Sequence, residues 1–237
     1  MTDGHGLTSL EKTVYAEMER PDVEALIPPA AQRILDVGCG AGSLGAALKQ
    51  RGDGVEITGI EMSPALATIA MDRLDHVLVG TVEEHLANLP DRHFDCVVFA
   101  DVLEHMVNPH QVLLAMRPKL EPDRGIVVAS IPNVRHWMVL EQLVLRGRWG
   151  YAERGLLDSG HLRFFTLHTI ETMFQWAGYR IHVADVVGVA PRILWWVDRI
   201  LAGKLRPFIV YQYLLIARPA AGADVPTTPW WSGNPNL

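Results

Sequence analysis

The feature that most constrains this chain is a glycine-rich stretch that follows a short apolar run. Ile34, Leu35 and Val37 have the character of a buried strand, interrupted by one acid. Residues 38–43 then alternate glycine with other residues, and residues 44–48 have helical spacing. Glycine allows the backbone of such a strand-to-helix turn to take positive φ, and the helix that follows presents N–H groups to a ligand. The stretch therefore predicts a site for a nucleotide-type ligand.

Two registers of this glycine pattern compete. Residues 40–45 satisfy G-x-G-x-x-G, the pattern of dinucleotide-binding turns, which is weak on its own. Starting at Asp36, the stretch also satisfies D-x-G-x-G-x-G, whose carboxylate would repel a pyrophosphate but could face the α-ammonium of an amino-acid ligand. Glu61 ends the next expected strand and is placed to bind ribose hydroxyls. An amino acid joined to a nucleoside indicates S-adenosylmethionine (SAM).

Further motifs follow in order, namely Gly59-Ile60-Glu61-Met62-Ser63, Phe94-Asp95-Cys96-Val97-Val98, Asp101-Val102-Leu103-Glu104-His105 and residues 125–133. Their order and spacing resemble those of the class I SAM-dependent methyltransferases over about residues 30–217. The resemblance implies a Rossmann-like, doubly wound α/β fold with a seven-stranded sheet in the order 3-2-1-4-5-7-6, whose last strand is antiparallel. It also implies an N-terminal helical segment and an acceptor lid after the fifth strand.

Apolar runs bounded by turn signals mark the expected strands. These are residues 34–37, 55–60, 76–80, 94–100, 125–130, 180–189 and 208–217. A helix is expected to begin after Thr166 as its N-cap and to stop at Gly178. Another is expected at residues 191–201, with an apolar stripe typical of a core face or a partner face.

The resemblance assigns the cofactor contacts to positions that match the family's motifs. Tyr15, in an expected helix at residues 10–18, is a candidate lid residue, or it packs on the edge of the sheet. Thr81 stands where related enzymes commonly have Asp, so its hydroxyl could accept a hydrogen bond from the adenine amino group. The expected SAM contacts are Tyr15, Asp36, Gly38, Cys39, Gly40, Glu61, Met62, Thr81, Val82, Asp101, Val102 and Leu103.

The length and composition predict one large domain. At 237 residues with 49% hydrophobic content, the chain can bury a single good core, which we expect over residues 1–217. Within it, residues 1–29 are expected to form a helical cap and residues 134–165 the acceptor lid, followed by a mobile tail at residues 218–237.

Charge and cysteine content bear on partners and location. The net charge of −6 argues against nucleic acid and anionic membranes as partners, although a local patch could still exist. Only two cysteines are present and residues 1–6 are polar, so we expect a cytoplasmic protein without an export signal. A homodimer is possible.

The expected acceptor lid carries an excess of arginine. We expect this region to bind a small-molecule or glycan-like acceptor with an anionic group, because guanidinium groups bind phosphates and carboxylates. The alternative is that the arginines form surface ion pairs with Glu141, Glu153 and Asp158. The expected acceptor contacts are Asn133, Arg135, Trp137, Arg148, Tyr151 and Arg163.

Three histidines are candidates for a catalytic base. A sugar-type hydroxyl is a poor nucleophile, so its methylation needs a general base or a Lewis acid. His136 ranks first because it follows the fifth strand directly, and His105 and His161 come next. Each of them could equally be a hydrogen-bonded structural histidine.

The segment Asp101-x-x-Glu104-His105 raises the possibility of a metal ion. It resembles the metal-binding segment of the ubiquinone-biosynthesis O-methyltransferases and the small-RNA 2′-O-methyltransferases, which usually have Glu where this chain has Asp101. Many metal-free methyltransferases also carry Leu-Glu-His here. We therefore expect SAM as the cofactor and no resident metal, with a divalent cation left as an alternative.

The sequence as a whole predicts SAM-dependent methylation of a hydroxyl on a small-molecule or sugar-type acceptor, in natural-product or polysaccharide biosynthesis. The alternatives are N-methylation of a small-molecule amine, SAM binding without turnover, and an NAD(P)-dependent reductase or epimerase. The last would commonly need Tyr-x-x-x-Lys, and no tyrosine of the chain has Lys four residues on.

Overall fold

The computed structural model of the protein describes residues 19–52, 54–188 and 190–220. Tyr15 and most of the expected tail lie outside these residues. The chain folds into two compact units, each with most of its contacts inside itself. Unit 1 comprises the residues up to Ala100 together with Pro118–Val128, and unit 2 comprises Asp101–Arg117 and the residues from Ala129 onward. The single domain expected from the sequence stays a prediction.

The strands form one seven-stranded sheet with the order β3-β2-β1-β4-β5-β7-β6, as expected. β1 pairs in parallel with β2 and β4, whereas β6 and β7 pair antiparallel, which also confirms the sequence analysis. The strands are β1 (Arg33–Val37), β2 (Glu56–Glu61), β3 (His76–Val79), β4 (Cys96–Ala100), β5 (Ile126–Pro132), β6 (Tyr179–Val187) and β7 (Gln212–Pro219).

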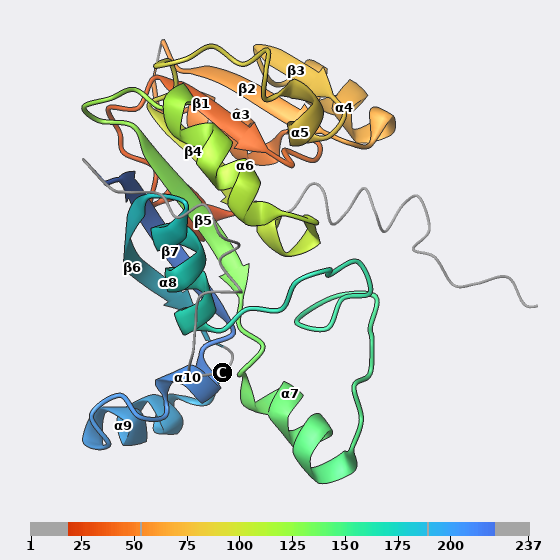
Figure 1. The fold of residues 1–237 in the computed structure, drawn as a ribbon, viewed down its shortest axis with the longest axis vertical. Coiled ribbons are helices and arrows are strands. Elements are labelled where there is room, and N and C mark those ends of the chain that lie inside the picture. Colours follow the sequence, from red (N-terminus) through yellow and green to blue (C-terminus); the bar gives the residue numbers. More distant parts are fainter. Residues whose placement is uncertain (1–18, 53, 189, 221–237) are drawn as a thin grey trace, which may run out of the picture. The chain divides into compact units, whose positions relative to one another are not determined.

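Unit 1 places short helices beside its parallel strands (Figure 1). The register sets Asp36 of β1 opposite Gly59 of β2 and Val37 opposite Ile60, so the two strands end side by side. β4 is buried along nearly its whole length, as a central parallel strand should be. The helices are α2 (Pro21–Glu24), α3 (Ser43–Lys49), α4 (Pro64–Met71) and α5 (Val82–His85), with the 3-10 turn η2 (Arg117–Lys119) at the unit boundary.

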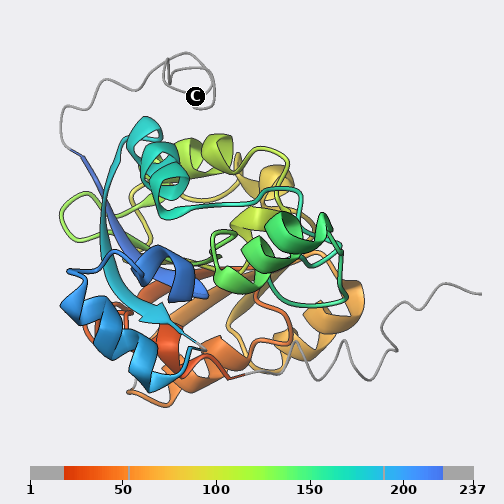
Figure 2. The ribbon, with the colours of Figure 1, turned by 90° about the horizontal axis from the view of Figure 1, so that it is seen from below.

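Unit 2 packs α8 on β6 (Figure 2). Thr166 caps α8 by accepting a hydrogen bond from the Thr169 N–H, and Gly178 follows its C-terminus at φ +79°, which confirms both expected helix ends. The Tyr179 hydroxyl donates to the carbonyl of Leu113 at 2.9 Å. The helices and turns are η1 (Leu103–His105), α6 (Pro109–Met116), α7 (Trp137–Leu140), its π-helical continuation η3 (Glu141–Leu145), α8 (Leu167–Trp176), α9 (Arg192–Ile200) and α10 (Arg206–Ile209).

The last strand differs from its expected bounds at both ends. Phe208 belongs to α10, because Pro207 fits the first turn of a helix and the apolar run beyond it does not distinguish helix from strand. β7 therefore begins at Gln212 rather than Phe208. At its other end, Arg218 and Pro219 pair with β6, so these two residues do not belong to the tail.

Gly59 of β2 shows how tightly the glycine loop packs on the sheet. A Cβ at this position would lie 2.6 Å from the Cys39 sulfur and 2.7 Å from Leu74 Cδ1. Real Cβ atoms do not approach other atoms this closely, so a side chain here would force the buried side chains of Cys39 and Leu74 to move.

We expect Gly59→Ala to lower the free energy of unfolding by about 1–3 kcal/mol, because the added methyl group overpacks this contact. Gly52→Ala is the matched control, since a Cβ there meets nothing within 4 Å. Urea unfolding of both variants measures the difference. Equal stability of the two variants would contradict the packing described.

Candidate active site

The loop after β1 has the backbone that the glycine pattern predicted. Gly38, Gly40 and Gly42 take φ values of 71°, 56° and 80°. The N–H groups of Gly38 and Cys39 donate to the carbonyl of Ile60 at 2.8 and 3.1 Å. The loop is thus attached to the end of β2, beside Glu61.

Glu61 is held by two backbone donors. Its Oε2 accepts from the Gly40 N–H at 2.9 Å, and its Oε1 accepts from the Ser63 N–H at 2.8 Å. Each carboxylate oxygen keeps a further lone pair, which suits the ribose hydroxyls expected here. Arg73, which the sequence analysis did not single out, supports the loop by donating to the carbonyl of Ala41 at 3.1 Å.

Asp36 is a buried acid, only 3% exposed. Burial raises the pKa of Asp36 to about 7, and the negative charge of Glu61 adds to this effect, while Arg20 opposes it. Arg20, which also pairs with Asp22 at 2.9 Å, was missed because no motif marks it. A buried carboxylate of this kind is stabilised by a ligand cation. The α-ammonium and sulfonium of SAM supply such charge, so the residues of unit 1 fit the cofactor.

The other expected SAM contacts of unit 1 have local roles that the structure defines. Thr81 caps α5, because its hydroxyl accepts from the Glu84 N–H at 3.4 Å. Burial raises the pKa of the Cys39 thiol, which therefore stays protonated. Val82 is buried and Met62 is 68% exposed. Contacts of these residues with adenine stay predictions, and Tyr15 lies outside the described residues.

Asp101, at the end of β4, has φ +58°, which is unusual for a residue other than glycine. Its Oδ1 accepts from the Ser130 hydroxyl at 2.9 Å and from the Gln212 amide at 2.7 Å. Nothing in the sequence marked Ser130 or Gln212 as its partners. Leu103 is fully buried and Val102 partly buried in the turn that follows.

Glu104, His105 and His161 form one group, which we call the histidine–carboxylate cluster. Their ligand atoms lie within 4.8 Å of one another. His161 Nε2 is 3.9 Å from Glu104 Oε1, and the two imidazole centroids are 4.7 Å apart. The N–H groups of Leu162 and Arg163 both donate to the Glu104 carbonyl at 2.9 Å, which fixes the loop that carries His161.

The hydrogen bonds of the two histidines define their tautomers. His105 Nδ1 lies 3.0 Å from the Gly160 carbonyl, and His161 Nδ1 lies 3.2 Å from the Leu156 carbonyl. Since a carbonyl can only accept, both Nδ1 atoms are donors, and each neutral ring has its lone pair on Nε2. Burial, together with His105, lowers the pKa of His161. Both Nε2 atoms can therefore accept a proton or bind a cation.

The residues of the histidine–carboxylate cluster differ from the metal ligands that the sequence analysis considered. Those were Asp101, Glu104 and His105, whereas the structure brings His161 to Glu104 and His105. One carboxylate and two imidazoles are a donor set typical of transition-metal and zinc sites. A backbone carbonyl at Nδ1 orients each of the two imidazoles, as is common for histidine ligands. The residues present fit a divalent cation.

His136, ranked first among the catalytic candidates, has a different hydrogen-bond pattern. It is fully buried, and its Nδ1 accepts from the Met138 N–H at 3.4 Å as the N-cap of α7. Burial lowers its pKa, so the ring is neutral with its proton on Nε2. Nε2 can then donate but cannot accept a proton. Among the described residues, this nitrogen has no hydrogen-bond partner.

Two of the expected acceptor contacts take part in hydrogen bonds that hold unit 2 together. Asn133 is fully buried, and its amide donates to the carbonyls of Pro207 and Val210 at 2.9 and 2.8 Å. Arg163 donates through Nε and Nη2 to the carbonyl of Val107 at 3.1 and 2.6 Å. These bonds give both side chains a structural role.

The remaining acceptor candidates are exposed. Arg135 lies over the ring of Phe208, with 4.8 Å between its guanidinium carbon and the centroid. Trp137 and Tyr151 are 46% and 61% exposed, and Arg148 is exposed as well. Of the ion pairs considered as the alternative, the described residues contain Arg146 with Glu141 at 2.6 Å.

Comparisons with known proteins agree with this geometry. A family described as a methyltransferase domain matches residues 14–183. The ubiquinone biosynthesis O-methyltransferase of Aeromonas salmonicida is 33% identical over 171 residues, which is 68% of each chain. The enzyme of the same name from Alkalilimnicola ehrlichii is 35% identical over 108 residues, and this match spans only 42% of its length.

A SAM-dependent methyltransferase from Archaeoglobus fulgidus shares the fold, with a TM-score of 0.63 at 18% identity over 87% of this chain and 93% of that one. This protein thus belongs to the methyltransferase domain family, as a class I SAM-dependent methyltransferase whose cofactor is SAM. The nicotinamide alternative, based on residues 40–45, is thereby set aside.

We expect the affinity for SAM to rise as the pH passes upward through about 7, because ionised Asp36 attracts the cationic end of the ligand. Asp36→Asn should bind SAM about tenfold more weakly and lose this pH dependence, since it removes a charge-assisted contact. Calorimetry between about pH 6 and 7.5, below the titration of the ligand's own amine, measures both effects.

Asp72→Asn, at an exposed position of the same unit, is the control and should titrate as the wild type does. A wild-type affinity that stays constant over this pH range would contradict the assignment of Asp36.

Proposed function

We propose that the protein transfers the methyl group of SAM to a hydroxyl oxygen of a small-molecule or sugar-type acceptor, and that the histidine–carboxylate cluster acts on that hydroxyl. The observation that carries the proposal is that His105, His161 and the buried carboxylate of Glu104 bring ligand atoms within 4.8 Å of one another, with His161 Nε2 3.9 Å from Glu104 Oε1.

The cluster favours oxygen over nitrogen as the methyl acceptor. A neutral amine is already a good nucleophile and needs mainly to be held in line with the sulfonium methyl group. A hydroxyl needs to lose its proton or to be polarised, and that requires a base or a Lewis acid. The two relatives above are named as O-methyltransferases, which supports the same choice.

As a base, the cluster would act through the imidazoles. Because burial lowers the pKa of His161, its ring is neutral at neutral pH and can accept a proton. His105 is an exposed residue, so its side chain can be approached from solvent. The carboxylate of Glu104, 3.9 Å from His161 Nε2, stabilises the imidazolium that results. These properties support His105 and His161 over His136 as our candidates for the base.

As a metal site, the same three side chains would provide one carboxylate oxygen and two Nε2 ligands. A divalent cation bound there would lower the pKa of an acceptor hydroxyl. Glu104 would supply the negative charge, and the Gly160 and Leu156 carbonyls would keep the two rings in the ligating tautomer. Three protein ligands leave coordination positions open for oxygen atoms of an acceptor.

We expect His161→Asn and His105→Asn each to lower kcat by about 100-fold or more, because the hydroxyl loses its proton acceptor or its cation. The assay measures S-adenosylhomocysteine formation with a panel of catechols and methyl glycosides. The binding of S-adenosylhomocysteine should not change. His168→Asn, an exposed histidine of the same unit, is the control and should keep the wild-type rate.

Chelation separates the two roles of the cluster. Loss of activity in EDTA that is restored by a divalent cation indicates a metal site, and activity that survives EDTA indicates a base. Wild-type rates in both histidine variants, or methylation of nitrogen in the product, would refute the proposal.

Arg148 is one of the expected acceptor contacts for an anionic group, and Arg154 of the expected lid is exposed as well. The side chain of Arg148 is exposed, and no ion pair joins it to the described residues, whereas Arg163 is hydrogen-bonded to Val107 and Arg146 to Glu141.

We expect Arg148→Glu to raise the KM for a phosphorylated or carboxylated acceptor by about tenfold, because an attractive charge becomes repulsive. The KM for a neutral acceptor and the affinity for SAM should stay the same. Arg180→Glu, which reverses an exposed charge on β6, is the control. An unchanged KM for the acidic acceptor would show that Arg148 does not contact its anionic group.

A further inference from the structure

Helix α9 presents an apolar face that the described part of the chain leaves uncovered. Ile193, Trp196 and Ile200 are 65%, 68% and 75% exposed, and their spacing places them along one side of the helix. Leu201, just beyond the helix, is 43% exposed. Single exposed apolar residues scattered over a surface are normal, but a contiguous group of them marks an interaction surface.

The exposed charged residues of α9, of the turn after it and of α10 are all basic. They are Arg192, Arg199, Lys204 and Arg206. The acid of the helix, Asp198, is 2% exposed, and its Oδ1 accepts from the N–H groups of Leu205 and Arg206 at 2.9 and 2.8 Å. Asp198 therefore fixes the turn between α9 and α10. Its Oδ2 also lies 3.5 Å from Arg206 Nε, so the basic residues of this face without an ion pair to the described residues are Arg192, Arg199 and Lys204.

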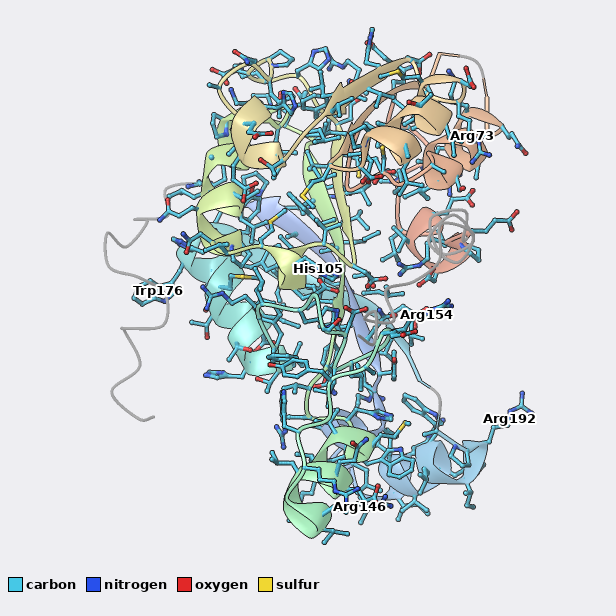
Figure 3. All side chains as sticks on the ribbon, turned by 90° about the vertical axis from the view of Figure 1, so that its right-hand side faces the viewer. Arg73, His105, Arg146, Arg154, Trp176 and Arg192 are labelled. Carbon is cyan, nitrogen blue, oxygen red and sulfur yellow. The ribbon has the colours of Figure 1, made fainter. Side chains whose placement is uncertain are left out.

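This basic helix belongs to an acidic protein, whose net charge is −6. Arg192 extends outward from α9 in Figure 3. Neither Arg192 nor Arg199 forms an ion pair with any described residue. Their charges are thus available to a partner.

A second exposed apolar stretch lies at the same end of unit 2. Val144 and Leu145 of η3 are 73% and 76% exposed, and they are followed by Arg146, which is paired with Glu141 at 2.6 Å. Figures 1 and 3 show α7 with its continuation and α9 both projecting from this end. The apolar and basic groups of the two helices therefore face solvent at one end of the unit.

We propose that this end of unit 2 binds the surface of an anionic lipid bilayer, with α9 lying in the headgroup region. Its apolar stripe would enter the acyl boundary, and its arginines and lysine would contact lipid phosphates. Tryptophan is suited to this interface, because its ring is apolar and its N–H is polar. Basic side chains can keep their charged groups in the headgroups while their stems lie along apolar surface.

Charge complementarity favours a bilayer over a second copy of this chain. Two copies that met through α9 would bring their basic groups together without exposed acids on α9 to neutralise them, and like charges repel. An anionic bilayer neutralises those charges and buries the apolar stripe at the same time. No helix of the described residues is long and apolar enough to cross a bilayer. The proposal does not depend on the methyl acceptor.

The test is flotation of the full chain with vesicles of phosphatidylcholine that contain phosphatidylglycerol, compared with vesicles of phosphatidylcholine alone. We expect the wild type to float with the anionic vesicles and to be released as salt is raised. Arg199→Glu with Lys204→Glu should weaken partitioning at least about tenfold, because each basic residue contributes about fivefold near an anionic surface. Trp196→Gln with Ile200→Gln should weaken it by a similar factor.

Matched controls distinguish a specific face from a general loss of charge or apolar area. Met71→Gln removes an exposed apolar side chain from α4, and Arg180→Glu reverses a charge on β6. Both should float as the wild type does. All variants should keep the wild-type melting temperature and affinity for S-adenosylhomocysteine.

Three outcomes would overturn the proposal. The first is a wild type that does not float with anionic vesicles. The second is flotation that the α9 variants do not weaken. The third is a dimer in light scattering that Trp196→Gln dissociates, without vesicle binding, which would assign the face to a second copy of the chain.

Discussion

The carboxylate of Glu61 is the contact on which the cofactor residues of unit 1 depend. It accepts N–H bonds from Gly40, in the loop after β1, and from Ser63, in the turn after β2. Because the parallel register ends both strands side by side, one side chain can fix both turns. Charge-assisted bonds of this kind are stronger than neutral ones. The position of the glycine loop is therefore set by the residue that is also expected to bind the ribose.

Asp36 lies near the end of β1, and its buried carboxyl group lowers the stability of the folded protein when no ligand is bound. Its carboxylate is buried near Glu61, and the raised pKa shows that ionisation there is opposed. Such a group costs stability as the pH rises toward its pKa, and a bound cation offsets that cost. The arrangement stabilises a cationic ligand in preference to a neutral one.

The parts of the protein that depend on local pattern could be predicted from the sequence. The glycine loop and the caps of α8 follow from residues close together in the chain, whereas the sheet order was implied by the resemblance to the class I methyltransferases. The cluster could be predicted only in part, because the long segment between His105 and His161 folds back by tertiary contacts that no local motif encodes. The tautomer of His136 likewise depends on an N–H that only the folded helix directs at it.

The hydrogen bonds of Asp101 join parts of the chain that the ribosome synthesises at different times. Gln212, which donates to its carboxylate, lies 111 residues further along the chain. During translation, the Asp101 carboxylate therefore lacks this donor until Gln212 has been synthesised. A nascent chain that stalls before residue 212 has the Ser130 hydroxyl as a donor to Asp101 but lacks the Gln212 amide.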